Sequence, residues 1–111
     1  VVSASGFGGE LQIVDASNPA APTIAASFAT FGDAMDVNVV GDRAYLAEAW
    51  PLNGLEILDL TNPTAPVALG YLQAIDDALE VAVHDDHAYV AVFDGGLMVA
   101  EIADPTSPAL A

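Results

Sequence analysis

The chain has 111 residues, of which 54% are hydrophobic, and 16 Asp and Glu residues against one basic residue, Arg43, give it a formal net charge of −15. Nucleic acids need Lys or Arg to displace their counterions, so this charge balance argues against nucleic acid as a partner. No apolar run reaches the roughly 18 residues of a membrane helix, so we expect no membrane insertion. The absence of cysteine excludes disulfides and thiolate metal sites.

Short apolar runs occur along the whole chain. Some alternate with polar residues, as at 11–15, others are nearly continuous, as at 81–83 and 89–93, and no run has the period of a helix. An Asn-Pro turn follows the first run, a Gly-Asp turn joins two later runs into a hairpin, and loops are expected at 31–33 and 48–53. The strands that this pattern predicts span residues 11–15, 23–30, 35–40, 43–47, 54–59, 67–72, 78–83 and 88–91.

One segment occurs three times, at residues 11–22, 55–66 and 97–108. In each copy an alternating apolar run ends on an acid, an Asx-Pro pair follows, and a second proline comes three residues after the first. The period is about 43 residues and holds four short strands, which is typical of the blade of a β-propeller.

The chain is therefore predicted to be all-β and to consist of propeller blades of four antiparallel strands. We expect a partial blade at 1–30, a complete blade at 31–73, and a blade lacking most of its outer strand at 74–111, all in one propeller domain. About two and a half blades cannot close a ring, which needs roughly 4–8. The expected partners are thus the other blades of a longer chain, which we favour, or neighbouring copies that complete the ring. Alone, the chain should associate through its uncovered faces.

The three segments resemble the LVIVD repeat, as do the hairpin at 41–45 and its counterpart at 85–89. The resemblance extends from residue 9 to residue 108, although the third copy has Glu101 in place of Asp and Asp104 in place of Asn. LVIVD repeats occur in bacterial and archaeal surface and secreted proteins, look like β-propellers and carry no catalytic signature. The resemblance therefore implies an extracellular or cell-surface protein that is not an enzyme.

Two recurring features have candidate roles in turns. Asp15, Asp59 and Glu101 occupy the same place in every copy, so we expect their carboxylates to cap backbone N–H groups of the Asx-Pro turn. The run from His84 to His87 contains two His and two Asp residues and would bind a divalent ion if all four side chains converged. Its repeat counterpart is the hairpin turn, which favours a structural role instead.

The irregular loops are the candidate binding face. Loops between blades and loops between second and third strands should emerge at the same end of the domain, where loops carry function on a rigid scaffold. Trp50 there is either an anchor for a peptide or sugar, or a plug over the blade edge. The acids form either a binding surface or a solvated rim. The candidate residues are Asp33, Asp36, Glu48, Trp50, Asp76, Asp77, Glu80 and Asp94.

Closely spaced carboxylates raise one another's pKa or recruit a cation. Their oxygen-only chemistry points to calcium, with Asp76, Asp77 and Glu80 as the strongest metal candidates. Alternatively, Asp36 and Glu80 occupy equivalent positions and bond the backbone of the neighbouring blade. We expect no other cofactor.

Two functions from different classes follow. The first is a non-catalytic surface or secreted scaffold for protein interaction, adhesion or extracellular assembly. The second is an enzyme or a calcium-dependent ligand-binding propeller that uses the acidic loop face. The sequence favours the first, because no catalytic constellation stands out.

Overall fold

The computed structural model describes residues 2–5 and 9–111, and within them the chain forms eleven β-strands and no helix. No described segment is a helix long and apolar enough to cross a membrane. The strands are β1 (Val2–Ser5), β2 (Glu10–Asp15), β3 (Thr23–Ala29), β4 (Asp33–Val40), β5 (Arg43–Ala49), β6 (Gly54–Asp59), β7 (Val67–Gln73), β8 (Ala78–His84), β9 (His87–Val92), β10 (Gly96–Glu101) and β11 (Ala109–Leu110).

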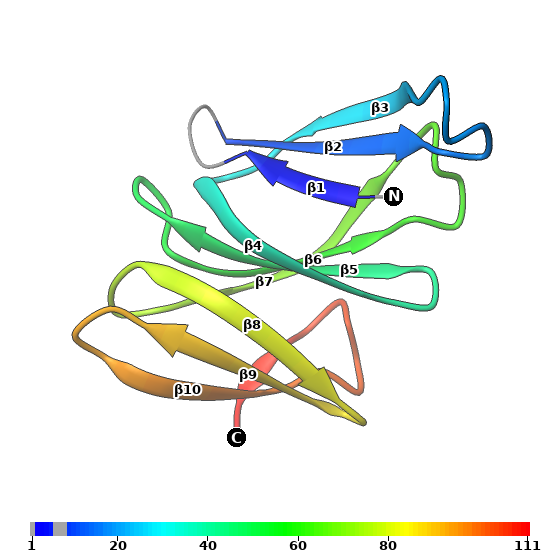
Figure 1. Cartoon of the computed structure of the whole chain (residues 1–111). Coiled ribbons are helices and arrows are strands. Elements are labelled where there is room, and N and C mark those ends of the chain that lie inside the picture. Colours follow the sequence, from blue (N-terminus) through cyan, green and yellow to red (C-terminus); the bar gives the residue numbers. More distant parts are fainter. Residues whose placement is uncertain (1, 6–8) are drawn as a thin grey trace.

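The strands form three antiparallel sheets that follow one another along the chain and stack face to face (Figure 1). The first blade is β1-β2-β3, the second is β4-β5-β6-β7, and the third is β8-β9-β10-β11. Neighbouring strands are joined in sequence order, as in a propeller blade. The predicted all-β class is confirmed, and the sheets are consistent with partial propeller blades.

The repeated turns form because side-chain oxygens close them. Asp15 Oδ1 accepts the backbone N–H of Ser17 at 2.9 Å, and Asp59 Oδ1 accepts that of Thr61 at 2.8 Å. Glu101 makes no such bond within the described part of the chain, so the expectation of a shared capping role is wrong for this residue. Asp104 instead takes the role of Asn18 and Asn62: its Oδ1 accepts the N–H of Thr106 at 3.0 Å, as theirs accept the N–H groups of Ala20 and Thr64.

Alternate side chains of each sheet are buried between blades, as period-2 patterning requires. Leu11 of the first blade packs against Leu46 and Leu58 of the second. On the other side of the second blade, Leu55 and Ile57 pack against a cluster that includes Val90 of the third. Each inter-blade contact therefore forms a separate apolar core.

Alanines occupy many of these buried positions and have no exposed surface at all. Because their side chains are short, the sheets can approach closely. Burial on both sides explains the nearly continuous apolar character of β5, whereas β9 is equally apolar but is buried on one side only. The fully buried alanines are Ala44, Ala47, Ala78, Ala88 and Ala100.

Candidate functional site

The loops between blades and the loops between second and third strands emerge at the same end of the molecule, on the left of Figure 1. We call this end, formed by residues 30–33, 50–53, 74–77 and 93–95, the loop face. Backbone hydrogen bonds tie the loops together: Asp33 N donates to Trp50 O at 3.2 Å, and Phe93 N donates to Asp77 O at 2.8 Å. The predicted convergence of these loops is confirmed.

The loop face exposes large apolar side chains. Trp50 is 73% exposed, so it is not packed over the blade edge as one of the two interpretations required, and Ile75 is 86% exposed. Phe31 lies edge-on against Tyr71, with ring centroids 5.3 Å apart, and still exposes 48% of its surface. Leu52 and Phe93 complete the exposed set at 45% and 56%. Among these residues, the sequence interpretation singled out Trp50 alone.

The aspartates near the loop face bond to backbone rather than converging on a common point. Asp36 accepts N–H groups from Val37 at 2.9 Å and, across the blade boundary, from Val81 at 3.0 Å. Asp76 Oδ1 accepts the N–H of Asp77 at 2.8 Å, and Asp77 Oδ1 accepts that of Trp50 at 2.9 Å. These bonds hold each aspartate against the backbone of its own or a neighbouring segment.

Within the described residues, no three His, Asp or Glu side chains gather as a metal site would require. The group Asp76, Asp77 and Glu80 is therefore not brought together as the calcium hypothesis needed. Glu80 lies on β8 and is exposed, Asp94 is exposed in the β9–β10 loop, and Asp33 is half-buried at the start of β4.

The two histidines flank the β8–β9 turn as the hairpin interpretation expected. His84 and His87 are directly opposite each other in the register of the two strands. His84 is exposed beside Asp85 at 3.4 Å, whereas the ring of His87 lies 6.5 Å from that of Tyr89.

Glu48 is the main correction to the sequence interpretation. It does not lie in an exposed loop but in β5, where its side chain is 0% exposed. Glu56 of β6, also 0% exposed, lies on the same side of the sheet, since it is opposite Leu46 and Glu48 is two residues further along β5. Both carboxyls therefore lie between the first and second blades. The strand β5 continues beyond its predicted end at residue 47, so its side chains keep alternating between the two faces of the sheet and Glu48 points inward.

The buried pair is short of hydrogen-bond donors. Glu48 Oε1 accepts the N–H of Gly32 at 2.8 Å, but Glu48 Oε2 and both oxygens of Glu56 have no partner among the described groups. Burial, reinforced by the neighbouring Glu56 carboxyl, raises the pKa of Glu48 to about 9. Burial also raises the pKa of Glu56. Glu48 therefore holds a proton at neutral pH, because two charges could not share this dry site.

The repeat provides its own comparison for this pair. The third blade has Val92 and Met98 at the positions of Glu48 and Glu56, and the first blade has Ser5 and Gln12 there. The fold does not require an acid at either position. The signal that could have revealed this site is the departure of the second copy from its neighbours.

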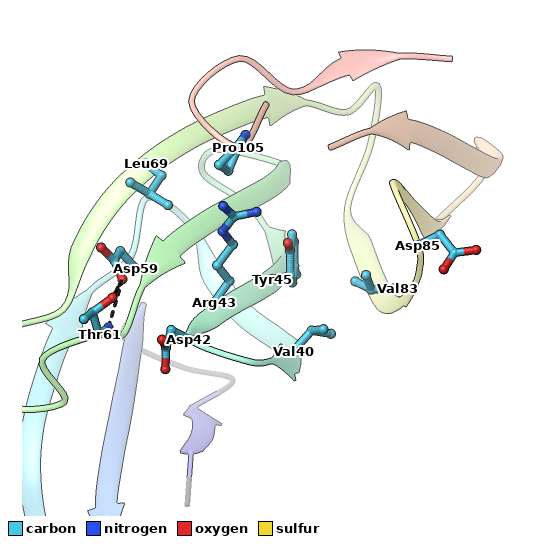
Figure 2. Close-up of a pocket in the computed structure, with 10 residues that line it drawn as sticks. All are labelled: Val40, Asp42, Arg43, Tyr45, Asp59, Thr61, Leu69, Val83, Asp85 and Pro105. Atoms are coloured by element: carbon cyan, nitrogen blue, oxygen red, sulfur yellow. Dashed lines mark hydrogen bonds between the residues drawn. The ribbon is translucent and has the colours of Figure 1, made fainter. Parts of the chain in front are cut away.

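A cleft at the opposite end, between the second and third blades, contains the side chain of Arg43 (Figure 2). Figure 2 shows this side chain extending toward Pro105 beside Tyr45 and Leu69. The cleft is also lined by Val40, Asp42, Asp59, Thr61, Val83 and Asp85. Hydrogen bonds from Thr61, with a smaller contribution from the charge of Arg43, lower the pKa of Asp59. One cation among three carboxylates makes a poor anion site, and the lining offers no nucleophile paired with a base.

Comparison with known proteins gives one finding on family. A family model described as LVIVD repeat matches residues 6–30, 31–72 and 76–111. No curated protein matches this sequence.

Proposed function

This chain belongs to the LVIVD repeat family, and we propose that it is a non-catalytic propeller scaffold, secreted or held at the cell surface, that binds a protein partner through its loop face. The observation that carries the proposal is the set of large apolar side chains exposed together on that face, above all Trp50 and Ile75. Exposed apolar groups of this size, gathered on one face, are typical of interaction sites.

The chemistry of the loop face also indicates the kind of partner. Trp50 presents a rigid aromatic surface, and aromatic side chains dominate the energetics of protein interfaces. Aspartates lie among the apolar groups, with Asp94 exposed and Asp33 and Asp76 half-buried. A partner with apolar side chains and a rim of Lys or Arg would complement such a surface.

The alternative of a calcium-dependent or enzymatic loop face has less support. Asp36 and Asp77 already accept hydrogen bonds from backbone N–H groups of neighbouring segments, and Glu48 is buried away from the surface. A structural role accounts for all three residues.

Location is tested by treating intact producing cells with protease and detecting the chain with an antibody. Loss of the chain without cell lysis is expected, and full protection would contradict a surface location. If the chain is secreted instead, it appears in the culture medium.

Binding is tested by coupling the full chain to beads and measuring the retention of proteins from a cell-surface extract. Trp50→Ala combined with Ile75→Ser should reduce the retained protein at least about tenfold, since aromatic anchors carry most of the energy of an interface. The matched control is Val67→Ser, which changes an apolar residue that is 56% exposed but lies at the opposite end. Equal retention by the loop-face variant and the control would overturn the proposal.

A further inference from the structure

The buried carboxyl pair of the second blade lies directly beneath the loop face. Glu48 and Glu56 are 0% exposed, and after Glu48 only one residue of β5 remains before the loop that contains Trp50. In the third blade Val92 and Met98 occupy the same positions. The repeat does not require these acids, so we asked what the pair does where it lies.

The register of the sheet shows which side chains face the pair. The strands beside Glu48 place only small residues next to it, Ala34 and Gly54. Glu56 lies between Leu46 and Tyr71. Within the described part of the second blade, the phenol of Tyr71 is therefore the one other titratable group that points to the side of the sheet where the pair lies and is next to it.

The remaining charged groups nearby point elsewhere. Asp33 and Asp36 of β4 are opposite residues of β5 whose side chains point toward the third blade, and the other charged residues of β5 and β6 line the cleft on that side. In the first blade Leu11 faces the second blade, so Glu10 points the opposite way, where Gln12 bonds to it at 2.9 Å. The strands β1 and β3 contain no titratable side chain.

The pair is short of donors unless it shares a proton. The N–H of Gly32 bonds to Glu48 Oε1 at 2.8 Å and leaves the other three carboxyl oxygens without a donor from the described groups. A proton on Glu48 supplies one, because a protonated carboxyl donates to the carboxylate beside it. Without that proton, two negative charges remain next to each other in a site that excludes solvent.

The crossover from the first to the second blade, residues 30–33, covers the pair at the loop-face end. It passes so close to the loop after β5 that a Cβ on Gly32 would lie 2.6 Å from Leu52 O. Thr30 Oγ1 donates to Gly32 O at 2.6 Å, and the ring of Phe31 lies edge-on against Tyr71. Since both carboxyls are fully buried, water reaches them from this end when the crossover moves.

The same crossover positions the exposed groups of the loop face. Asp33 N donates to Trp50 O at 3.2 Å, and Trp50 N donates to Asp77 Oδ1 at 2.9 Å. Phe31 is itself one of the exposed apolar residues of this face. A movement of the crossover therefore breaks a bond that holds Trp50 and displaces Phe31 as well.

We infer that Glu48 and Glu56 form a pH switch that controls the shape of the loop face. With a shared proton, the pair stays dry and the crossover stays in place. When the proton is lost, the two charges draw in water, the crossover moves away from β5, and the apolar groups of the loop face separate. The consequence for binding rests on the proposed function: a partner that binds the ordered loop face is released, and its binding in turn makes the proton harder to remove.

The direction of the pH effect follows from burial. Burial, reinforced by the neighbouring Glu56 carboxyl, raises the pKa of Glu48 to about 9, so the loop face keeps its shape at neutral pH and loses it as the pH rises through about 9. Burial raises the pKa of Tyr71 as well, so its phenol stays neutral while Glu48 titrates.

Trp50 reports on the switch, because it is the only tryptophan in the chain. Its fluorescence anisotropy is measured in the full chain between about pH 6 and about pH 10, with far-ultraviolet circular dichroism to follow the fold. The anisotropy should fall with a midpoint near the pKa of Glu48, about 9, while the circular dichroism stays constant. The amide signal of Gly32 in a ¹⁵N-glycine-labelled sample should shift with the same midpoint, which tests the pair without any substitution.

Glu48→Gln combined with Glu56→Gln removes the titration, so the anisotropy of this variant should stay constant over the same range. The matched control is Glu80→Gln combined with Glu101→Gln, which changes the net charge equally at two exposed residues and should behave as the parent does. Every variant keeps the three tyrosines, so tyrosine ionisation contributes equally to all curves.

Three results would overturn the inference. They are a constant anisotropy in the parent, an equal fall in the variant that lacks the pair, and a fall that coincides with loss of circular dichroism, since the blades would then unfold as a whole.

Retention of proteins from a cell-surface extract separates this inference from the proposed function. On beads, the parent should retain at least about tenfold less protein at pH 9.5 than at pH 6.5, and the Glu48→Gln, Glu56→Gln variant should retain similar amounts at both. Equal retention by the parent at both pH values would contradict control of binding by the pair. No retention at either pH would refute the proposed function, whereas the anisotropy of Trp50 would still decide whether the switch exists.

Discussion

Asp36 and Val81 join two blades: Asp36 Oδ2 on β4 accepts the backbone N–H of Val81 on β8 at 3.0 Å. Val81 is 6% exposed, so water cannot readily replace this acceptor. The bond is the polar counterpart of the apolar core between the second and third blades. It also explains why an acid recurs at this position without forming a metal site.

We expect Asp36→Ala to destabilise the chain by about 1–3 kcal/mol, because the buried N–H of Val81 loses its acceptor. Urea unfolding measures the change in the free energy of unfolding. Glu80→Ala is the matched control, since it removes an acid at the equivalent position on an uncovered face and should change the free energy very little. Similar losses in the two variants would contradict a role for Asp36 in joining the blades.

The second prediction concerns pH and the buried pair Glu48 and Glu56. The pKa of Glu48 is about 9 in the folded protein against 4.5 for an ordinary Glu, so between these values the folded state binds more protons than the unfolded state. The contribution of Glu48 to the free energy of unfolding is therefore fully present below about pH 4.5 and is lost as the pH rises toward 9. The free energy of unfolding should fall by on the order of a few kcal/mol between pH 5 and pH 8.5.

Glu48→Gln combined with Glu56→Gln is the control for this pH dependence. The amides keep an acceptor for the N–H of Gly32 but do not titrate, so the fall in stability between pH 5 and pH 8.5 should become much shallower. The lowered pKa values of the exposed Asp15 and Asp59 act below this range and do not interfere. An unchanged slope would mean that other carboxylates cause the effect.

Much of the fold could be predicted from the sequence because its signals are local. The Asn-Pro turns, the Gly-Asp hairpin and the apolar pattern at 55–59 each act within a few residues, and each has a counterpart in another copy of the repeat. The convergence of the loops at one end followed from the blade topology. The burial of Glu48 could not be predicted from local signals. It depends on how far β5 continues beyond Ala47 and on the first blade, which packs over this side of β5. The contact between Asp36 and Val81 joins residues 45 positions apart, and only the stacking of blades brings them together.

The third prediction uses the repeat as a guide to stability. Glu56→Met places in the second blade the residue that the third blade has at the same position, Met98. It removes an unpartnered buried carboxyl and leaves Glu48 bonded to the N–H of Gly32. We expect the variant to be more stable than the parent at pH 8 by roughly 1–4 kcal/mol, because apolar replacements of buried ionisable groups are often stabilising. Thermal unfolding at pH 5 and pH 8 tests this, with a smaller gain at pH 5; a loss at both would show that Met does not fit between these two blades.

The last prediction concerns Gly32, where the loop from the first to the second blade passes the loop after β5. A Cβ at this position would lie 2.0 Å from Ala49 O and 2.6 Å from Leu52 O, both backbone atoms that cannot move independently. Gly32→Ala should therefore cost roughly 3 kcal/mol through overpacking, and it should also disturb the hydrogen bond from Gly32 N to Glu48. The matched control is Gly41→Ala in the β4–β5 turn, where nothing lies within 4 Å and only the positive φ of 59° opposes a side chain. That variant should lose only about 1–2 kcal/mol. Urea midpoints compare the two, and a Gly32 variant no less stable than the Gly41 variant would mean that the two loops separate without cost.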